Sequence, residues 1–481
     1  MAEAAQQDRD PADRRMSWRR GSRIEEALAT LKLSSPIAAG LLAEMGMGVA
    51  DYVMAGKLGA DHLAAAGLGV QLLFTFHLLP MGALGSVSAL AAQALGAEDQ
   101  AQVSRVVRQG LRFALCLVVP AVFCALLVAP LLRASGHYEA TVIDQVAALI
   151  AYGLPSIPAV LLFTVLRNYV TVLHRPMVAT VTALIALPLT VLGNYITLYG
   201  HFGCPALGVP GIGLTMSIVQ WLQLGIIFLY INRQPVLRGY HVFTDLLHSD
   251  GKVLRDLWRV GWPIAAGYAF ESGMFMTSTV LIGEFGVATL AAHNAVLNLS
   301  SISFMIPYAI SQAATVRVGY AIGAEAPRAA RRAGYTGIVL GMIWMACMAS
   351  VLTLLPRLLL GFYMDVDAPI NEGAVALGLT LLPIAALFQL VDGLQVTTIG
   401  ALRGLKDTRV PMVMCGCGYW LAGLGSGYWL AFHLGFHGPG LWWGLAIGLM
   451  VSATLLLLRW KQMSDRLVLR ADPAAALSES V

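Results

Sequence analysis

The chain has 481 residues, of which 58% are hydrophobic and only 12% are charged. Water-soluble globular proteins carry about 25% charged residues, so this composition excludes an ordinary soluble domain. The formal net charge is only +4, and the basic residues follow a membrane-topology pattern described below, so nucleic acid is not an expected partner. The composition predicts an all-α protein that crosses a lipid bilayer many times.

The amino terminus is basic, with Arg14, Arg15, Arg19, Arg20 and Arg23 in its first two dozen residues. The apolar stretch that follows is longer than the 7 to 15 residues of a signal-peptide core, and no small-residue cleavage site accompanies it. Residues 1–24 are therefore predicted to be a disordered cytoplasmic tail.

Twelve apolar runs follow, each long enough for the roughly 20 residues that a membrane-spanning helix needs. They lie near residues 33–55, 66–92, 112–132, 146–166, 177–199, 211–231, 259–283, 292–316, 335–356, 374–400, 411–433 and 440–458. The pattern predicts two six-helix lobes, residues 25–235 and 259–460, joined by a cytoplasmic linker at 236–258. Residues 461–481 are predicted to be a second cytoplasmic tail.

The distribution of Lys and Arg predicts the orientation, because basic loops stay on the cytoplasmic side. With both termini inside, 28 of the 31 basic residues lie in cytoplasmic segments. Only Lys57, Arg133 and Arg357 remain outside. The anionic lipids of the cytoplasmic leaflet are the expected neighbours of this charge.

The two halves of the chain repeat one another. Residues 36–47 read PIAAGLLAEMGM and residues 263–274 read PIAAGYAFESGM, an offset of 227 residues. The same offset holds without a gap as far as the Gly-Ala-Glu segments at 96–98 and 323–325. Two-fold repeats that enclose ionisable groups build the midplane binding sites of secondary transporters, so the repeat points to a transporter.

Four acids lie within the predicted spans: Glu44 and Asp51 in the first, Glu271 in the seventh and Asp392 in the tenth. Each costs at least about 2.5 to 3.5 kcal/mol at mid-helix unless it faces a cavity or a partner. We expect no basic residue beside them at that depth. Unpaired carboxylates in an apolar cavity attract cations and allow a proton to compete for the same oxygens, which is the chemistry of an antiporter.

Asp51 lies only about two turns before the predicted outer loop, so snorkelling to water is an alternative interpretation for it. Gln389 and Gln395 flank Asp392 at i−3 and i+3 and predict a polar stripe on that helix. Asn194 and His293 are further candidates for the same cavity. The alternative for each is a hydrogen bond between helices.

Other function classes lack their signatures. The six cysteines show no disulfide or metal-binding pattern, and no paired nucleophile and base stands out for an intramembrane enzyme. No GxxxxGK[ST] loop occurs, so an ATP-driven pump is disfavoured. The protein is expected to be neither an enzyme nor dependent on a cofactor.

Four sequence segments are distinctive: Asp51-Tyr-Val-Met-Ala-Gly-Lys-Leu-Gly, Leu290-Ala-Ala-His, Gly400-Ala-Leu-Arg-Gly-Leu-Lys-Asp-Thr-Arg409, and Asn194-Tyr-Ile with the later Gly211-Ile-Gly. They resemble the multidrug and toxic compound extrusion (MATE) family, in its NorM branch. The resemblance covers residues 30 to 460. It implies two six-helix lobes and export of amphipathic organic cations in exchange for Na⁺ or H⁺.

The resemblance also assigns roles to residues. Asp51 matches the acid of the family's first helix, and Glu271 and Asp392 match its cation site, where they would bind the metal ion if Na⁺ is coupled. Phe388 stands where Na⁺-coupled relatives often have a Tyr, which removes an oxygen ligand. Glu44 stands where relatives often have a neutral amide, and an additional acid favours proton coupling.

Together these features predict a secondary multidrug antiporter, monomeric, in a bacterial inner membrane with both termini in the cytoplasm. Its predicted binding residues are Glu44, Asp51, Asn194, Glu271, Phe388, Gln389, Asp392 and Gln395. The alternative is a flippase for lipid-linked precursors, which would need arginines in its cavity to hold a pyrophosphate.

Overall fold

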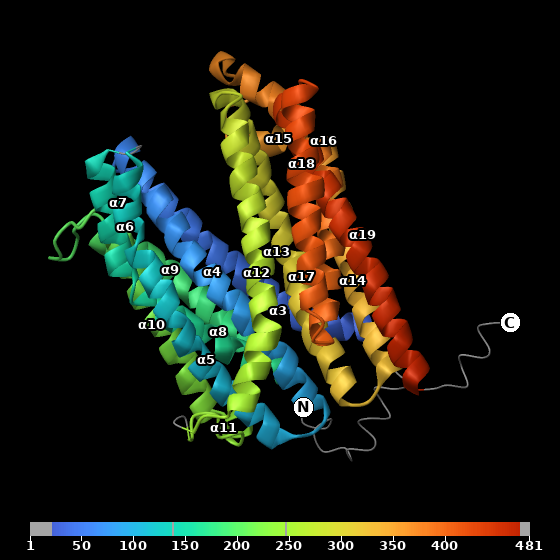
Figure 1. Cartoon of the computed structure of the whole chain (residues 1–481). Helices are drawn as coiled ribbons and strands as arrows, with labels where there is room; N and C mark the ends of the chain where they lie inside the picture. The colour runs from blue at the N-terminus through green and yellow to red at the C-terminus, as the bar shows by residue number, and fades with distance from the viewer. Residues whose placement is uncertain (1–21, 137–138, 246–247, 472–481) are drawn as a thin grey trace. The chain divides into compact units, whose positions relative to one another are not determined.

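The computed structural model describes residues 22–136, 139–245 and 248–471, and within these residues every regular element is helical (Figure 1). The predicted amino-terminal tail falls almost entirely outside these residues. The first half of the chain forms α3 Arg23–Gly56, α4 Ala60–Gly96, α5 Gln100–Leu126, α6 Val128–Ser135, α7 Ala140–Gly153, α8 Ser156–Val172, α9 Met177–Thr197, α10 Pro210–Arg233 and α11 Pro235–Arg238.

The second half begins with α12 Gly251–Gly283, α13 Val287–Gly323, α14 Pro327–Leu354, α15 Pro356–Leu360 and the 3₁₀ turn η1 Pro369–Asn371. It continues with α16 Glu372–Gly404, α17 Arg409–Gly416, the π-helix η2 Cys417–Leu424, α18 Gly425–Tyr428, the π-helix η3 Trp429–His433 and α19 His437–Ala471.

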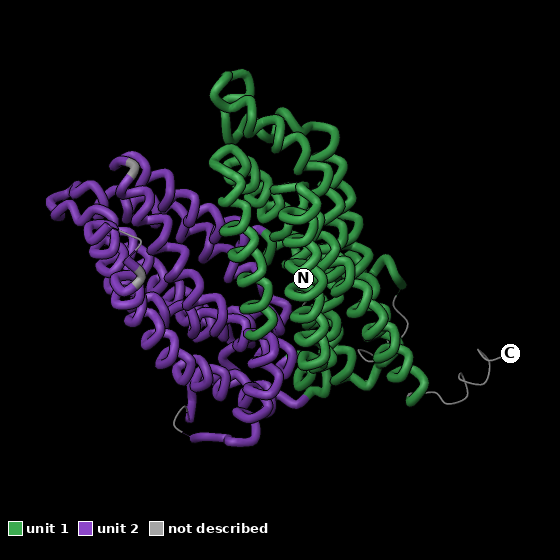
Figure 2. The backbone as a smooth tube through the Cα atoms, turned by 45° about the horizontal axis from the view of Figure 1, so that its top comes forward, with its two compact units in different colours: residues 1–38, 92–98, 266–481 green, residues 39–91, 99–265 purple. Residues whose placement is uncertain are grey.

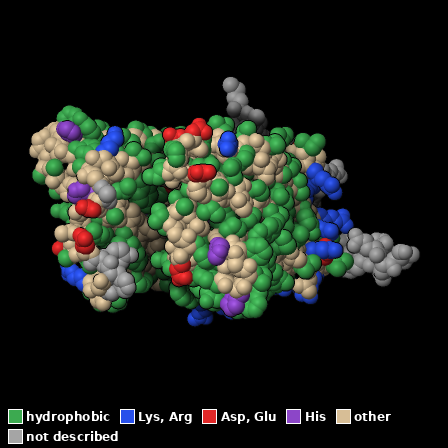
Figure 3. Space-filling view, turned by 90° about the horizontal axis from the view of Figure 1, so that it is seen from above, with side chains coloured by type: hydrophobic (Ala, Val, Ile, Leu, Met, Phe, Trp, Pro, Cys, Tyr) green, Lys and Arg blue, Asp and Glu red, His purple; other side chains and the backbone are tan. Residues whose placement is uncertain are grey.

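Eight of these helices are long and apolar enough to cross a bilayer, and α7 with α8, bent by 46° at their junction, would make a ninth span. The helices α12 and α13, of 33 and 37 residues, are also long enough to cross a bilayer. The consecutive segments α17 to η3 complete the twelve predicted spans within the described residues. Large apolar side chains such as Val119, Val280 and Leu354 are more than 60% exposed, as suits surfaces that face lipid. Figure 3 shows hydrophobic side chains over much of the face drawn there.

The first long helix begins at a capping box. The backbone N–H of Glu25 donates to Ser22 Oγ at 3.1 Å, and the N–H of Ser22 donates to Glu25 Oε2 at 2.8 Å. Two backbone donors that the helix leaves unpaired are thereby satisfied. Ser22 and Glu25 therefore fix where α3 starts.

The internal repeat is visible in the elements. The offset of 227 residues that relates the two sequences also carries both ends of α4 onto both ends of α13, and the end of α3 onto the end of α12. Even rare backbone conformations recur, since Glu98 and Glu325 have φ of 61° and 53°. Non-glycine residues seldom adopt positive φ, so the two halves share local backbone geometry as well as sequence.

The helices group into two compact units (Figure 2). Unit 1 holds residues 266–471 with two segments of the first half, 22–38 and 92–98. Unit 2 holds residues 39–91 and 99–265. Each unit therefore includes residues from both predicted lobes, and α3 and α12 each contribute to both units.

Unit 1 is held together where the two repeats touch. A Cβ atom on Gly96 would lie 2.0 Å from the backbone oxygen of Tyr320, and one on Gly323 would lie 1.9 Å from that of Gln93. The backbones thus meet directly, as small residues allow in membrane helices. The unit's apolar core includes the fully buried Trp442 and Trp460.

Candidate functional site

Unit 2 contains two of the predicted acids, both on α3. Asp51 is only 3% exposed, so the structure contradicts the interpretation that it snorkels to water. Its Oδ1 accepts a 2.6 Å hydrogen bond from Nδ2 of Asn194, a fully buried residue of α9. Among the described residues Asp51 forms no ion pair. The structure therefore brings Asn194 and Asp51 together in a hydrogen bond between α9 and α3, which is the alternative interpretation given for Asn194.

Glu44 has a partner that the sequence did not reveal. Arg167 of α8 donates from Nη1 to Glu44 Oε1 at 3.0 Å, and their side chains are 16% and 32% exposed respectively. The expectation that no basic residue lies beside these acids is therefore wrong for Glu44. Arg167 was assigned to a cytoplasmic loop, but α8 continues to Val172. Helical side chains point back toward the amino terminus, so this arginine reaches into the span.

Unit 1 contains the other two acids, Glu271 on α12 and Asp392 on α16. They are 121 residues apart in sequence, yet their carboxylates lie close enough to interact electrostatically. Asp392 is 7% exposed and Glu271 is partly buried. Two neighbouring carboxylates in a desolvated setting repel one another, and a shared cation or proton relieves that repulsion.

Arg403, in the last turn of α16, is a second basic residue near an acid. It interacts electrostatically with Glu271, and its Nη1 donates to the Tyr268 hydroxyl at 3.2 Å. The guanidinium also lies 5.1 Å from the centre of the Tyr268 ring, a cation-π contact. Tyr268 in turn bonds Tyr308 at 2.9 Å. The expectation of an arginine-free site is therefore wrong in unit 1 as well.

The polar stripe on α16 makes bonds to two other helices. Gln389 donates to Ser303 Oγ at 2.6 Å, and Gln395 donates to the hydroxyl of Tyr419, which lies in the π-helix η2. The side-chain oxygens of both glutamines are buried and lack a hydrogen-bond partner within the described chain. These glutamines thus join helices, and each keeps one oxygen that can accept from a ligand. Tyr419, which sequence reasoning missed, interacts electrostatically with both acids.

Phe388 lies one turn before Asp392 and is 2% exposed. Its ring meets Phe275 edge-on at 6.1 Å and Trp442 at 5.7 Å between centroids. It supplies an aromatic wall and no oxygen near the acid, in agreement with the departure noted in the sequence.

His293 is held as a neutral imidazole. Trp442 Nε1 donates to His293 Nδ1 at 3.2 Å, and an indole N–H can only donate. The proton must therefore reside on Nε2, which lies 2.9 Å from Thr279 Oγ1. In this arrangement His293 orients α13 against its neighbours and has no acceptor nitrogen left for a second proton.

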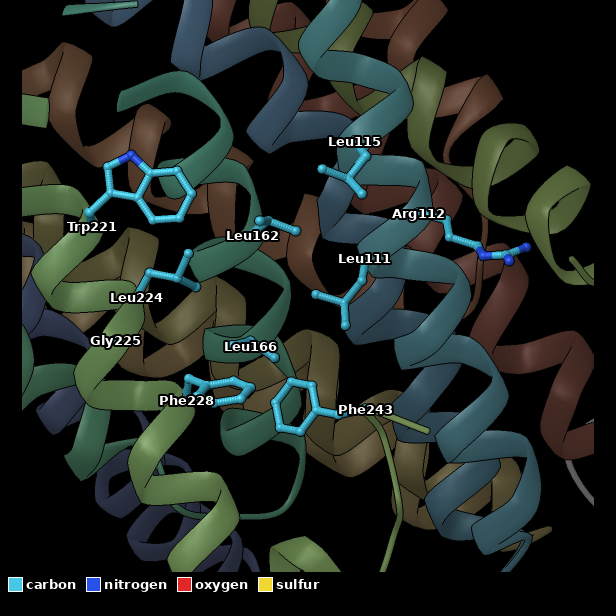
Figure 4. Close-up of a pocket in the computed structure, with 10 residues that line it drawn as sticks. All are labelled: Leu111, Arg112, Leu115, Leu162, Leu166, Trp221, Leu224, Gly225, Phe228 and Phe243. Atoms are coloured by element: carbon cyan, nitrogen blue, oxygen red, sulfur yellow. The ribbon is translucent and has the colours of Figure 1, made fainter. Parts of the chain in front are cut away.

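A pocket of about 430 Å³ lies elsewhere in unit 2, between α5, α8 and α10 (Figure 4). Its lining is almost wholly apolar, with Leu111, Leu162, Trp221 and Phe228 turned toward it. Arg112 extends away from these side chains in that view. No acid lines the pocket, so it has no carboxylate to attract a cation.

Comparison with known proteins assigns the chain to a family. The MatE family model matches residues 36–196 and 263–429, one segment in each repeat. The chain belongs to the MatE family. It is 38% identical to "Probable multidrug resistance protein NorM" of Burkholderia mallei over 451 residues, which is 93% of this chain and 95% of the relative. It is 37% identical to "Multidrug resistance protein NorM" of Burkholderia vietnamiensis, over 92% of this chain and 95% of that protein.

A crystal structure of the eukaryotic MATE transporter AtDTX14 has the same fold as this MatE protein. The TM-score is 0.83 at 19% sequence identity, over 93% of this chain and 99% of the other. The predicted family, the all-α polytopic fold and the assignment as a transporter rather than an enzyme are confirmed.

Proposed function

We propose that this MatE protein is a multidrug efflux transporter that exports amphipathic organic cations in exchange for H⁺ or Na⁺. The relatives named as NorM multidrug resistance proteins support the efflux activity. The observation that carries the exchange is the pair Glu271 and Asp392, two carboxylates from different helices that interact in a desolvated setting. Such a pair accepts a cation or a proton and does not hold both at full affinity.

Coupling follows from competition at this pair. An organic cation neutralises the repulsion between the carboxylates, and its aromatic parts meet a wall that includes Phe388 and Phe275. Entry of a proton or Na⁺ from the outside neutralises the same charge and removes the attraction for the drug. A tenfold gradient of the entering ion supplies about 1.4 kcal/mol for each ion exchanged, which can sustain up to a tenfold gradient of the exported cation.

Arg403 adjusts this competition. Its charge acts on Glu271, so the pair behaves as less than two full negative charges. Na⁺ prefers several oxygen ligands, as hard cations do. The oxygens available are the two carboxylates and the unpartnered side-chain oxygens of Gln389 and Gln395. Phe388 adds no oxygen ligand, which favours H⁺ over Na⁺ as the coupling ion.

We further propose that the protein is a monomer in a bacterial inner membrane with both termini in the cytoplasm. The asymmetry of Lys and Arg supports this orientation. No cofactor is required, because the gradient of the coupling ion supplies the driving force.

The test is transport of a fluorescent organic cation in proteoliposomes with either an imposed pH gradient or an imposed Na⁺ gradient. We expect one gradient alone to drive uptake of the dye, and Asp392→Asn to abolish it. Asp144→Asn is the matched control, since it neutralises an acid that is 66% exposed at its pair with Arg133. If neither gradient moves the dye, cation antiport is the wrong function.

The second candidate is a flippase for lipid-linked precursors, and Arg167 and Arg403 are the residues that favour it. Arg167 is neutralised by Glu44, however, and Arg403 is near Glu271. Both arginines would therefore have to leave an acid before they could bind a pyrophosphate. If the dye is not transported, movement of a fluorescent polyprenyl pyrophosphate lipid is the measurement that follows.

A further inference from the structure

The apolar pocket between α5, α8 and α10 opens at the surface of unit 2. Leu111 and Leu166 form its inner wall and are 7% and 1% exposed. Leu115, Trp221 and Phe228 form its rim and are 52%, 48% and 43% exposed. Its volume of about 430 Å³ lies in the range of about 300 to 1,000 Å³ for cavities that enclose small ligands. Because the exposed rim is apolar, the pocket is accessible from the bilayer.

The pocket lies near the end of unit 2 that the distribution of basic residues predicts to be cytoplasmic. Phe243, from the segment between α11 and α12, contacts Phe228 with ring centroids 4.7 Å apart and lies at that end of the pocket (Figure 4). Leu166 and Phe228 lie within about two helical turns of the last residues of α8 and α10, which is about 10 Å. The orientation proposed above therefore places the pocket in the cytoplasmic leaflet.

The adjoining part of α5 is basic. Arg105, Arg108 and Arg112 recur at i, i+3 and i+7 and therefore lie on one side of that helix. Arg112 belongs to the pocket lining, and no acid does. Arg108 precedes Leu111 of the inner wall by about one turn, so it lies closer to the cytoplasmic end. This margin of the pocket thus favours an anion and disfavours a cation.

Arg108 is held beside the pocket by the segment that contains Phe243. Its Nη1 donates to the carbonyl of Thr244, the residue after Phe243, at 3.4 Å. Asp245 lies 3.7 Å from the same nitrogen, but its side chain is 79% exposed, and such surface pairs contribute little. An anionic headgroup at the membrane surface can therefore displace Asp245 from Arg108 without the loss of a strong ion pair.

We propose that the pocket binds one acyl chain of an anionic phospholipid from the cytoplasmic leaflet, and that Arg108 with its basic neighbours on α5 binds the headgroup. Acyl chains surround a membrane protein on all sides, so the apolar lining alone does not select a lipid. Each basic residue near the membrane surface favours an anionic lipid by about fivefold. The site goes beyond the proposed antiport and shares with that proposal only the cytoplasmic orientation.

Trp221 at the rim reports on the occupant. The purified full-length protein is placed in nanodiscs of phosphatidylcholine, and either brominated phosphatidylglycerol or brominated phosphatidylcholine is added in increasing proportion. Bromine quenches tryptophan fluorescence on contact, and the difference between the wild type and Trp221→Phe isolates Trp221 among the ten tryptophans. We expect half-maximal quenching of Trp221 at a proportion of the anionic lipid that is lower by about fivefold or more than that of the zwitterionic lipid.

Gly225 allows the pocket to be filled by one substitution. It lines the pocket, and a Cβ atom there meets nothing within 4 Å. Gly225→Phe is therefore expected to place its ring in the pocket and to abolish the preference for the anionic lipid. Leu222→Phe is the matched control, because Leu222 lies on the same helix, is 46% exposed and does not line the pocket. It is expected to retain the preference of the wild type.

Substitutions of Arg108 test the headgroup contact. Arg108→Gln is expected to lower the preference for phosphatidylglycerol by about fivefold. Arg108→Lys is expected to keep most of the preference, because it retains the charge. Arg133→Gln removes an exposed arginine of α6, on the side predicted to be external, and controls for the net charge of the protein.

Equal quenching of Trp221 by the two lipids, unchanged in Gly225→Phe, means ordinary lipid contact and overturns the inference. Loss of the preference in Gly225→Phe without any effect of Arg108→Gln also overturns it, because the pocket then takes an acyl chain whatever its headgroup. If neither lipid quenches Trp221, protein such as a second copy of the chain covers the pocket, and the inference is wrong.

The comparison of the two lipids on the wild type does not depend on Gly225→Phe, so it remains decisive if that variant does not fold. Transport of the dye in proteoliposomes is measured separately. A negative result for the lipid site therefore leaves the proposed antiport standing, and a failure of dye transport leaves the lipid site standing.

Discussion

At the scale of single residues, each acid of this protein is defined by its immediate partner. Glu44 has an arginine, Asp51 has an amide, Asp392 interacts electrostatically with Glu271, and Glu271 also interacts with Arg403. Carboxylates of one chemical type therefore differ in accessible charge. Sequence spacing placed all four within predicted spans, but the partners determine how much of each negative charge is left uncompensated.

The bond between Asn194 and Asp51 leads to a prediction on stability. Asn194→Leu removes the hydrogen bond to the carboxylate of Asp51, a residue that is only 3% exposed. Leaving a buried polar group unsatisfied costs about 1 to 3 kcal/mol, so we expect the melting temperature of the purified protein to fall by several degrees. The measurement is thermal unfolding in detergent, followed by intrinsic fluorescence.

Gln223→Leu is the matched control for that substitution. Gln223 is also a buried amide, but its Nε2 has no hydrogen-bond partner among the described residues. Its replacement by an apolar residue of similar size is expected to leave stability unchanged or higher. An equal loss in the two variants would show that the Asn194 bond contributes nothing specific to Asp51.

At the scale of elements, the contact between the two repeats depends on glycine. The carboxyl end of α4 and that of α13 approach so closely that a Cβ on Gly96 or Gly323 would overlap a backbone oxygen of the other helix. Backbone atoms cannot rotate away as a side chain can. The equivalence of the two glycines under the repeat makes this a symmetric contact within unit 1.

Gly96→Ala and Gly323→Ala are therefore expected to destabilise the protein by about 3 kcal/mol each, the upper range for overpacking a filled site. Gly48→Ala is the matched control, because it lies inside α3 and a Cβ there meets nothing within 4 Å. Alanine at that position should stabilise the protein by at most about 1 kcal/mol, because alanine has a higher helix propensity than glycine. Chemical unfolding monitored by circular dichroism compares the three, and equal stabilities would contradict the close approach.

At the scale of the whole molecule, much of the architecture was predictable and the partners were not. Hydropathy and the offset of 227 residues indicated twelve helical spans in two related halves, and the helix bounds follow that offset. Arg167 was missed because the apolar run was taken to end at residue 166, whereas the helix continues to Val172. Tyr419 was missed because residues 411–433 were predicted as an ordinary helix. Residues 417–424 of that segment form a π-helix instead.

The sequence pattern also did not predict which segments group into each unit. Each predicted lobe is one continuous stretch of the chain, yet the structure groups residues 22–38 of the first half with the second half. An ion pair explains this attachment. Glu26, 3% exposed, accepts from Arg317 Nε at 2.5 Å and lies 3.9 Å from Arg332. The first turn of α3 is thus bound to α13 and α14 rather than to its own repeat.

This attachment predicts that Glu26→Gln lowers the free energy of unfolding by about 3 kcal/mol, the range for breaking a buried ion pair by removing one partner. The loss should persist at high salt, because buried charges are poorly screened. Asp144→Asn, at the exposed pair with Arg133, should cost less than about 1 kcal/mol and lose even that in salt. Thermal unfolding of both variants at low and high ionic strength makes the comparison. If Glu26→Gln behaves like the exposed pair, then packing between α3 and the second half, and not this charge, holds residues 22–38 in unit 1.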